Sequence, residues 1–292
     1  MFTNSAIATD THKDIENYLS GLGLFFRSFF RVKDTRSLET KLGKKRYSKI
    51  GKKLQDAIGI RIVLYFPEDI DIVVYLLSKK FRIVEKTIDE PDDNEFCPTR
   101  CNLIFQLAER RASSFADNYA AYNGCVDSTY EVQIRTIFSE GWHEIEHDLR
   151  YKCKESWDGH RDLSRTLNGI YASLMASEWS IEKIFDDLSY RFYKDKNWDG
   201  MLKNKIRLRF DGDILNTSIV DSFSRFPLLA KNFFRIERQT ILKSVADHGL
   251  HFPMNLNNII FFYNAINVHD DLISKLAPEA LLDELEQHGI VS

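Results

Sequence analysis

The segment from Tyr130 to Thr136 carries three functional side chains at every second position. Its apolar residues alternate with Glu131, Gln133 and Arg135, and this alternation predicts a β-strand that buries one face. On such a strand the three polar side chains point the same way, about 7 Å apart. The row offers a carboxylate, an amide and a guanidinium, which suit proton transfer and anion binding. An exposed polar face of a sheet has the same pattern, so both interpretations stay open at this point.

A strongly basic segment precedes that strand. Arg31 and Lys33 come just before a predicted helix whose N-cap is expected to be Ser37. The N-terminus of a helix attracts anions, and Arg31, Lys33 and Lys41 would surround a phosphate bound there. A solvent-exposed basic helix is the alternative interpretation of the same residues.

Two opposite charges, Asp56 and Arg61, flank the start of a predicted buried strand. An isolated charge at such a position is costly unless it has a partner or binds a metal ion. Asp56 is therefore a candidate metal ligand as well as a candidate ion-pair partner.

The stretch from His143 to His147 matches H-E-x-x-H, the motif of zinc proteases. On a helix this motif places two imidazoles on one face for Zn²⁺, with Glu144 as general base. Glu146 puts a second carboxylate into the motif, and no third ligand is evident downstream. A zinc metalloprotease is therefore only an alternative interpretation.

The composition excludes several classes of protein. The chain has 292 residues, 43 % of them hydrophobic, and a net charge of −3, which argues against a protein whose whole surface binds polyanions. From Phe26 to Lys53, however, eleven Lys and Arg stand against two acids, a local balance of +9. Neither a secretory signal nor an apolar stretch that would span a membrane is apparent, so a cytoplasmic protein without a membrane partner is expected.

Apolar periodicity predicts the elements that position these residues. Helices are expected at 10–30, 37–54 and 69–79, from 136 onward and at 161–187, and strands at 58–66, 81–85, 102–107 and 128–135. This order predicts an α+β fold, a small mixed β-sheet flanked by helices, as a domain of residues 1–196. Residues 197–292 are expected to form a mostly helical region with one strand at 205–210 and a regulatory or oligomerisation role.

Four motifs follow one another along the chain. They are R-x-K-x-x-x-S-L-x-x-K-L from Arg31, D-x-x-G-I-R-I from Asp56, E-V-Q-I-R-T from Glu131 and W-x-x-x-E-H-x-x-x-Y-K from Trp142. In this order they resemble the synthetase domain of the RelA/SpoT family, specifically the small alarmone synthetases and their toxic members. The resemblance extends over about residues 10–190.

The resemblance implies a nucleotidyltransferase-like fold and a pyrophosphotransferase activity. In that reaction the β,γ-diphosphate of ATP moves to the ribose 3′-OH of an acceptor nucleotide, and AMP is released. ATP is the implied donor and Mg²⁺ the implied cofactor. The resemblance also assigns Glu146 and His147 to the synthetase pocket rather than to a zinc site.

The same resemblance implies a role for each motif residue. Catalytic roles fall to Glu131, Asp56 and Glu146, and Mg²⁺ would be held by Asp56 and Glu131. The residues implied in ATP binding are Arg31, Lys33, Ser37, Lys41 and Arg61. The residues implied in acceptor binding are Gln133, Arg135, His147 and Arg100.

The acceptor-binding segment departs from the family pattern G-Y-R-S-L-H. This chain has Phe96 to Phe105 there, where Arg100 matches the family's arginine while the tyrosine and the histidine are missing. Three acceptors fit: GTP or GDP held by other groups such as Tyr119 or Tyr122, an adenosine nucleotide, or the 3′ end of a tRNA. A catalytically inactive nucleotide-binding regulator is the alternative function. An antitoxin, another regulator or a second copy of the chain is the expected partner of the C-terminal region.

Overall fold

The computed structural model describes residues 3–44, 47, 51–89, 101–210, 212 and 214–291. By their internal contacts the residues form two compact units. The first unit comprises Met1–Asn17, Phe26–Ile70 and Lys80–Glu178, and the second comprises Tyr18–Phe25, Asp71–Lys79 and Trp179–Ser292. The domain boundary at residue 196 stays a prediction from the sequence.

The first unit is built on a five-stranded mixed sheet with the strand order β1-β2-β5-β4-β3. Strands β2 and β5 run parallel, and the other neighbouring pairs run antiparallel. The strands are β1 (Phe26–Val32), β2 (Ile58–Leu64), β3 (Ile83–Ile88), β4 (Cys101–Gln106) and β5 (Thr129–Thr136). The predicted α+β class is confirmed.

Alternating burial gives the sheet one apolar face and one polar face. Ile60 and Ile62 of β2 are fully buried and pair with Val132 and Ile134 of β5, which are buried as well. On the neighbouring strand, Phe105 of β4 lies opposite Tyr130 and stacks on its ring at a centroid distance of 5.6 Å. The residues between these positions point to the opposite face, where the polar side chains gather.

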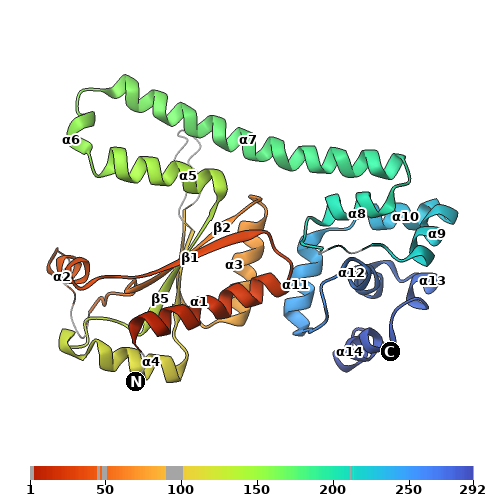
Figure 1. Cartoon of the computed structure of the whole chain (residues 1–292), viewed down its shortest axis with the longest axis horizontal. Helices are drawn as coiled ribbons and strands as arrows, with labels where there is room; N and C mark the ends of the chain where they lie inside the picture. The colour runs from red at the N-terminus through yellow and green to blue at the C-terminus, as the bar shows by residue number, and fades with distance from the viewer. Residues whose placement is uncertain are drawn as a thin grey trace. The chain divides into compact units, whose positions relative to one another are not determined.

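Helices flank both faces of the sheet (Figure 1). On the apolar face, α1 and α4 are joined by an ion pair of 2.5 Å between Asp14 and Arg111. On the polar face, α5 contacts β2 and β5. The helices and helical turns that start in the first unit are α1 (Asn4–Gly21), α2 (Thr35–Lys44), α3 (Asp69–Lys80), α4 (Glu109–Asn118), η1 (Ala120–Tyr122), α5 (Ile137–Ile145), the π-helical turn η2 (Glu146–Tyr151), α6 (Lys154–Trp157) and α7 (Arg161–Lys194).

The rest of the second unit is helical, as the sequence predicts. Its elements are α8 (Trp198–Ile206), α9 (Thr217–Arg225), α10 (Pro227–Phe234), α11 (Arg238–His248), α12 (Leu256–Tyr263), η3 (Asn264–Val268), α13 (Asp271–Ser274) and α14 (Glu279–Gln287). Aromatic rings contribute to its core: Phe223 packs edge-on against Trp198 at 6.0 Å, and its ring is tilted against that of Phe233 at 5.0 Å. In the described part of the chain, no helix is both long and apolar enough to cross a membrane.

The single helix predicted at 10–30 is wrong in its second half. Helix α1 ends at Gly21, Gly23 has a left-handed φ of 74°, and the chain then enters strand β1 at Phe26. A glycine adopts this φ without strain, so the chain can reverse its course there. The spacing of Ile15 and Leu19 correctly predicts the first half as helix, and both are buried; Leu22, just past the end of α1, is buried as well.

Two further predicted elements are wrong. No strand forms at 205–210, because α8 extends through Ile206 and Arg207 then turns to a φ of 49°. The helix predicted at 37–54 starts earlier, at Thr35, and residues 51–54 are not helical. Leu54 instead forms a parallel bridge to Val126, which extends the pairing between the β2 and β5 regions.

The core of the first unit depends on Phe105, which is fully buried. Phe105→Ala is expected to lower the free energy of unfolding by about 3–5 kcal/mol, because it removes buried apolar surface and leaves a cavity beside Tyr130. Urea unfolding of the full chain measures this. Val84→Ala, at a position 48 % exposed on β3, is the control and is expected to change the value by less than about 0.5 kcal/mol. Equal effects of the two substitutions would contradict the described packing.

Candidate active site

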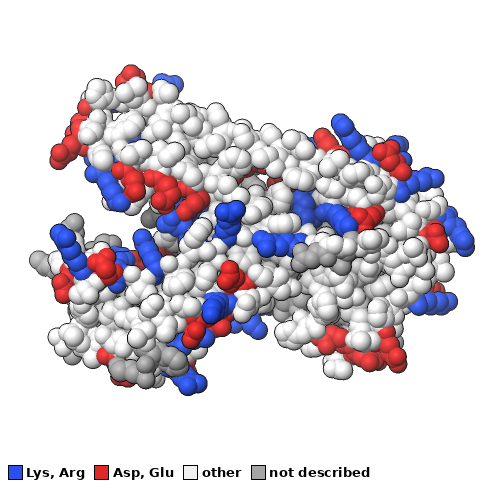
Figure 2. All heavy atoms as spheres, viewed as in Figure 1, with Lys and Arg blue, Asp and Glu red and all other residues white. Residues whose placement is uncertain are grey.

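A cavity of about 1000 Å³ opens on the polar face of the sheet. Strands β1, β2, β4 and β5 form one wall, and α5 with η2 forms the other. Figure 2 shows acidic side chains gathered over α5 with basic side chains beside them. Seven of the residues predicted from the sequence line this cavity: Arg31, Arg61, Glu131, Gln133, Arg135, Glu146 and His147.

The carboxylate of Glu131 is held by two amides. Asn102 of β4 donates to Oε1 at 3.1 Å, and Gln133 donates to Oε2 at 3.0 Å. The register explains this arrangement, because Asn102 pairs with Gln133, which is two residues along β5 from Glu131 and on the same face. The sequence did not single out Asn102 as a site residue. The available signal was that it is a polar residue at the start of the strand predicted at 102–107.

Gly59 separates Arg31 from Glu131 across the sheet. Arg31 pairs with Gly59 on one side, and Glu131 pairs with Gly59 on the other. A Cβ at Gly59 would lie 3.5 Å from Nε of Arg31, so the arginine side chain lies over this glycine. The absence of a side chain at Gly59 thus leaves room for the Arg31 side chain to lie across β2.

Two glutamates of α5 bind the arginines of the sheet. Nη1 of Arg61 donates to Glu140 at 2.5 Å and to Glu144 at 2.6 Å, and Arg135 donates to Glu140 at 3.3 Å. Burial lowers the pKa of the Arg61 guanidinium, but the bonds to the two glutamates outweigh it and raise the pKa overall. For Arg135, burial dominates and lowers the pKa.

The part of Glu140 in this site was missed by the sequence analysis. Glu140 and Glu144 are four residues apart on one helix, so they share a face. That spacing was the only local signal. Their partner Arg61 is 79 and 83 residues away in the sequence.

Asp56, Lys33 and Lys41 form a separate cluster that does not line the cavity. Lys33 donates to Oδ2 of Asp56 at 2.9 Å, and Lys41 donates to the same oxygen. Burial raises the pKa of this carboxyl, but the bonds to the two lysines lower it overall. Oδ1 of Asp56 is buried without a hydrogen bond. One carboxylate thus holds two of the cations predicted to bind ATP.

The predicted N-cap of the basic helix is wrong. Asp34, not Ser37, caps α2: its Oδ1 accepts from the Ser37 amide and its Oδ2 accepts from the Ser37 hydroxyl, both at 2.8 Å. These bonds lower the pKa of Asp34. An aspartate three residues earlier is as good a cap as a serine, so the sequence alone left the start of the helix uncertain by one turn.

Three rings stack along α5 and η2, and two of them, His143 and His147, line the cavity. His143 lies 5.4 Å from His147, which lies 5.8 Å from Tyr151, with interplanar angles of 19° and 11°. Nδ1 of His147 is 2.8 Å from the carboxylate of Asp148. Glu146 accepts from Arg150 at 3.4 Å.

The zinc-protease alternative finds no support in this geometry. Glu144, which would be the general base, is bound to Arg61. Within the described ranges, no three His, Cys, Asp or Glu side chains gather as a metal-binding group. The H-E-x-x-H match is a by-product of His143 standing four residues before His147.

Two predicted features lie wholly or partly outside the described residues. Arg100 and most of the divergent segment from Phe96 belong to the undescribed range 90–100. Within the basic segment from Phe26 to Lys53, residues 45, 46 and 48–50 are not described. Tyr119 and Tyr122, the alternative acceptor contacts, pack against each other with tilted rings at a centroid distance of 5.9 Å and do not line the cavity.

Fold and site together define an α+β domain with a large, charged cavity on one face of a mixed sheet. Residues 30–156 match the family model described as a region found in RelA/SpoT proteins. The chain therefore contains a RelA/SpoT-family synthetase domain, and all the residues that line the cavity, except Phe29, lie within the matched range.

Solved structures with a similar fold include two small alarmone synthetases and one pyrophosphokinase family member. Small alarmone synthetase 1 from Bacillus subtilis is 21 % identical with a TM-score of 0.45; the match covers 61 % of this chain and 92 % of that chain. Small alarmone synthetase 2 from the same organism is 23 % identical with a TM-score of 0.44, over 62 % and 90 %. A GTP pyrophosphokinase family protein from Streptococcus pneumoniae is 20 % identical with a TM-score of 0.45, over 62 % and 88 %. No curated protein matches the chain.

The environment of His143 predicts how the free energy of unfolding depends on pH. Burial, followed by the charges of Arg135 and Arg61, lowers its pKa from 6.5 to about 4. As the pH falls, the unfolded chain binds a proton at His143 before the folded chain does. The stability contributed by neutral His143 is therefore fully present above pH 6.5, and the free energy of unfolding falls as the pH is lowered towards 4. The free energy of unfolding at about pH 7 and about pH 5 measures this loss. It should be smaller in His143→Gln and unchanged in His251→Gln, an exposed control; an unchanged loss in His143→Gln would contradict the assigned environment.

Proposed function

We propose that this protein transfers the β,γ-diphosphate of ATP to the ribose 3′-OH of a nucleotide acceptor. One observation carries the proposal: within a RelA/SpoT-family domain, the carboxylate of Glu131 faces a cavity of about 1000 Å³ shared with Arg31, Arg61 and Arg135. A cavity of this size accommodates two nucleotides, and its arginines suit phosphate groups.

The proposed reaction is a displacement at the β-phosphorus. The acceptor O3′ forms a bond to the β-phosphorus, the bond from that phosphorus to the oxygen bridging to the α-phosphorus breaks, and AMP leaves. Glu131 takes the proton of the 3′-OH, for which it must lie within hydrogen-bond reach. Gln133 orients this carboxylate through its present bond of 3.0 Å. Arg31, Arg61 and Arg135 stabilise the negative charge that develops on the transferred group.

The phosphates of ATP, the proposed donor, would compete with acidic side chains for the lysines and arginines that bind them in this structure. Lys33 and Lys41 are bound to Asp56, so a triphosphate that attracts these lysines would release an oxygen of Asp56. Ser37, in the first turn of α2, would contribute through its hydroxyl once Asp34 releases it. Arg61 is a candidate for stacking on adenine once its bonds to α5 are exchanged.

We propose that Mg²⁺ is held by carboxylates of this unit together with substrate phosphates, although Asp56 itself lies outside the cavity lining. This ion prefers one or two carboxylates and keeps water and phosphate oxygens as its other ligands. Asp56, with a buried unbonded Oδ1, and Glu131, in the cavity wall, would be those carboxylates. When bound, Mg²⁺ would neutralise charge on the transferred diphosphate.

For the acceptor we propose a guanosine nucleotide, GTP or GDP, with an adenosine nucleotide and the 3′ end of a tRNA as the other outcomes of a screen. Gln133, Arg135, His147 and Arg100 are the proposed acceptor contacts. Two structures of Bacillus subtilis small alarmone synthetase 1 are described as bound to its product pppGpp and to AMPCPP. Glu146 is proposed to brace this side of the cavity through its pair with Arg150.

A second candidate function is a nucleotide-binding regulator without turnover. The observation that favours it is the pairing of Lys33, Lys41, Arg61 and Arg135 with acidic side chains in the ligand-free chain. If these pairs persist when ATP binds, transfer would be slow or absent.

Release of AMP from labelled ATP tests the proposal, with Mg²⁺ and with GDP, GTP, ATP or tRNA as acceptor. Glu131→Gln is expected to lower the rate by about 100-fold or more, because it removes the proton acceptor while keeping the shape. Asp56→Asn should lower it too, and chelation of Mg²⁺ should abolish it. Glu85→Gln, at an exposed position of β3, is the matched control and should retain full activity.

The outcomes of this assay separate the candidates. ATP binding without AMP release from any acceptor would overturn the transferase and support the regulator. Full activity in both Glu131→Gln and Asp56→Asn would overturn the assigned base and metal ligands.

We also propose that a second copy of the chain or a regulatory protein such as an antitoxin binds outside the cavity. In the first unit, Leu163 and Ile170 of α7 are seven residues apart on one side of the helix and are 53 % and 51 % exposed. Exposed apolar residues at this spacing are typical of helix pairing.

Self-association through α7 is expected to depend on these two side chains. The double variant Leu163→Glu and Ile170→Glu should lower the mass measured by sedimentation to that of one chain, because it places charges in the contact. Lys183→Glu, an exposed position on the same helix, is the control. A single-chain mass for the unaltered protein would contradict self-association and leave a regulatory protein as the proposed partner.

A further inference from the structure

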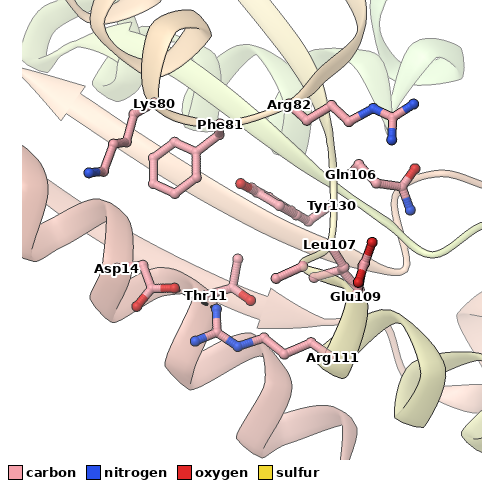
Figure 3. Close-up of a pocket in the computed structure, with 11 residues that line it drawn as sticks. Thr11, Asp14, Lys80, Phe81, Arg82, Gln106, Leu107, Glu109, Arg111 and Tyr130 are labelled. Carbon is pink, nitrogen blue, oxygen red and sulfur yellow. Dashed lines mark hydrogen bonds and ion pairs between the residues drawn. The ribbon is translucent and has the colours of Figure 1, made fainter. Parts of the chain in front are cut away.

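A second cavity, of about 340 Å³, lies on the other face of the sheet from the candidate active site. Figure 3 shows its lining, drawn from α1, from the ends of α3 and β4, and from α4, with Tyr130 of β5. Tyr130 and Glu131 are neighbours on β5 and therefore point to opposite faces. The two cavities thus share no lining residue.

The hydroxyl of Tyr130 is the polar group at the centre of this cavity. Tyr130 is only 2 % exposed, and within the described part of the chain no hydrogen bond is found for its hydroxyl. The hydroxyl is not among the fully buried polar atoms that lack a partner, so it opens to the cavity, where a ligand can donate to it or accept from it. Burial also raises the pKa of Tyr130, so the group stays a neutral donor and acceptor.

Aromatic rings give the cavity flat apolar walls. Phe105 is stacked on Tyr130 and packs edge-on against Phe81 at 6.1 Å, which holds the ring of Phe81 beside the tyrosine. The hydroxyl of Tyr130 lies on the side of Phe81 (Figure 3). A ligand with a flat ring and a hydrogen-bonding edge would satisfy both features at once.

The charges around the cavity favour an anionic ligand. Of the five charged residues in its lining, three are basic and two are acidic. Asp14 is neutralised by Arg111 at 2.5 Å. The guanidinium of Arg82 extends on the other side of Tyr130 from that pair (Figure 3), and Arg82 is exposed, so it can reach a phosphate at the cavity mouth.

We propose that this cavity is a second binding site, for a nucleoside monophosphate. The base would lie between Phe81 and Tyr130 and bond to the tyrosine hydroxyl, and the phosphate would be bound by Arg82. The volume is at the lower end of the range of about 300–1000 Å³ for small-molecule sites, which suits one nucleotide. The site is independent of the transfer reaction proposed above, since a chain that releases no AMP can still bind a nucleotide here.

Calorimetric titration with AMP and GMP tests the proposal, using the full chain with Arg61→Ala to weaken binding at the candidate active site. Tyr130→Phe keeps the ring and removes only the hydroxyl, and should weaken binding about fivefold. Arg82→Ala should weaken it about tenfold. Lys86→Ala, an exposed position on β3 outside the cavity, should leave it unchanged.

Inorganic phosphate and benzoate serve as comparison ligands, because each carries only part of the expected chemistry. Weaker binding of both than of AMP or GMP would support the proposal. Absence of binding by either nucleotide at millimolar concentration would overturn it. So would unchanged affinity in Tyr130→Phe or in Arg82→Ala, or binding of benzoate as tight as that of the nucleotides.

Discussion

The pairing register between the parallel strands β2 and β5 is the constraint on which the candidate site depends. It places Gly59 opposite Glu131 and Arg61 opposite Gln133. A shift by one residue would turn the polar row into the core and the apolar row out to solvent. The buried pairs of isoleucine and valine on the other face fix the register, because exposing them would lose their burial. Hydrophobic packing on one face thus positions the chemistry on the other.

Acidic side chains form ion pairs with the arginines of the candidate site and with the lysines of the separate Asp56 cluster. Arg61 and Arg135 are bound by glutamates of α5, and Lys33 and Lys41 by Asp56. These pairs remove much of the desolvation cost that partly buried charges would carry alone. They also mean that the strongly basic segment near β1 is not a bare positive surface. A phosphate group bound as proposed would have to displace carboxylates that already pair with these cations.

Strand β5 separates two environments that differ by a single residue in the sequence. Glu131 faces the large charged cavity between the sheet and α5, while Tyr130 faces the small aromatic cavity beside α1 and α4. Because successive side chains of a strand point to opposite faces, neighbours in sequence contact different elements. Strand β5 thus lines both cavities, and it lies within the residues that match the RelA/SpoT family model.

The sequence by itself determined the α+β class, the strand that carries Glu131, Gln133 and Arg135, and the order of the family motifs, because apolar alternation and motif spacing are local properties. It could not distinguish Asp34 from Ser37 as the helix cap, nor find the turn at Gly23 between α1 and β1, since helix ends depend on small local differences. Only the tertiary structure decided that Arg61 binds Glu140 and Glu144, that Asp56 holds both lysines, and that Tyr130 faces a cavity. The physical reason is that periodicity encodes which way a side chain points, whereas its partner is set by whichever distant segment packs against that face.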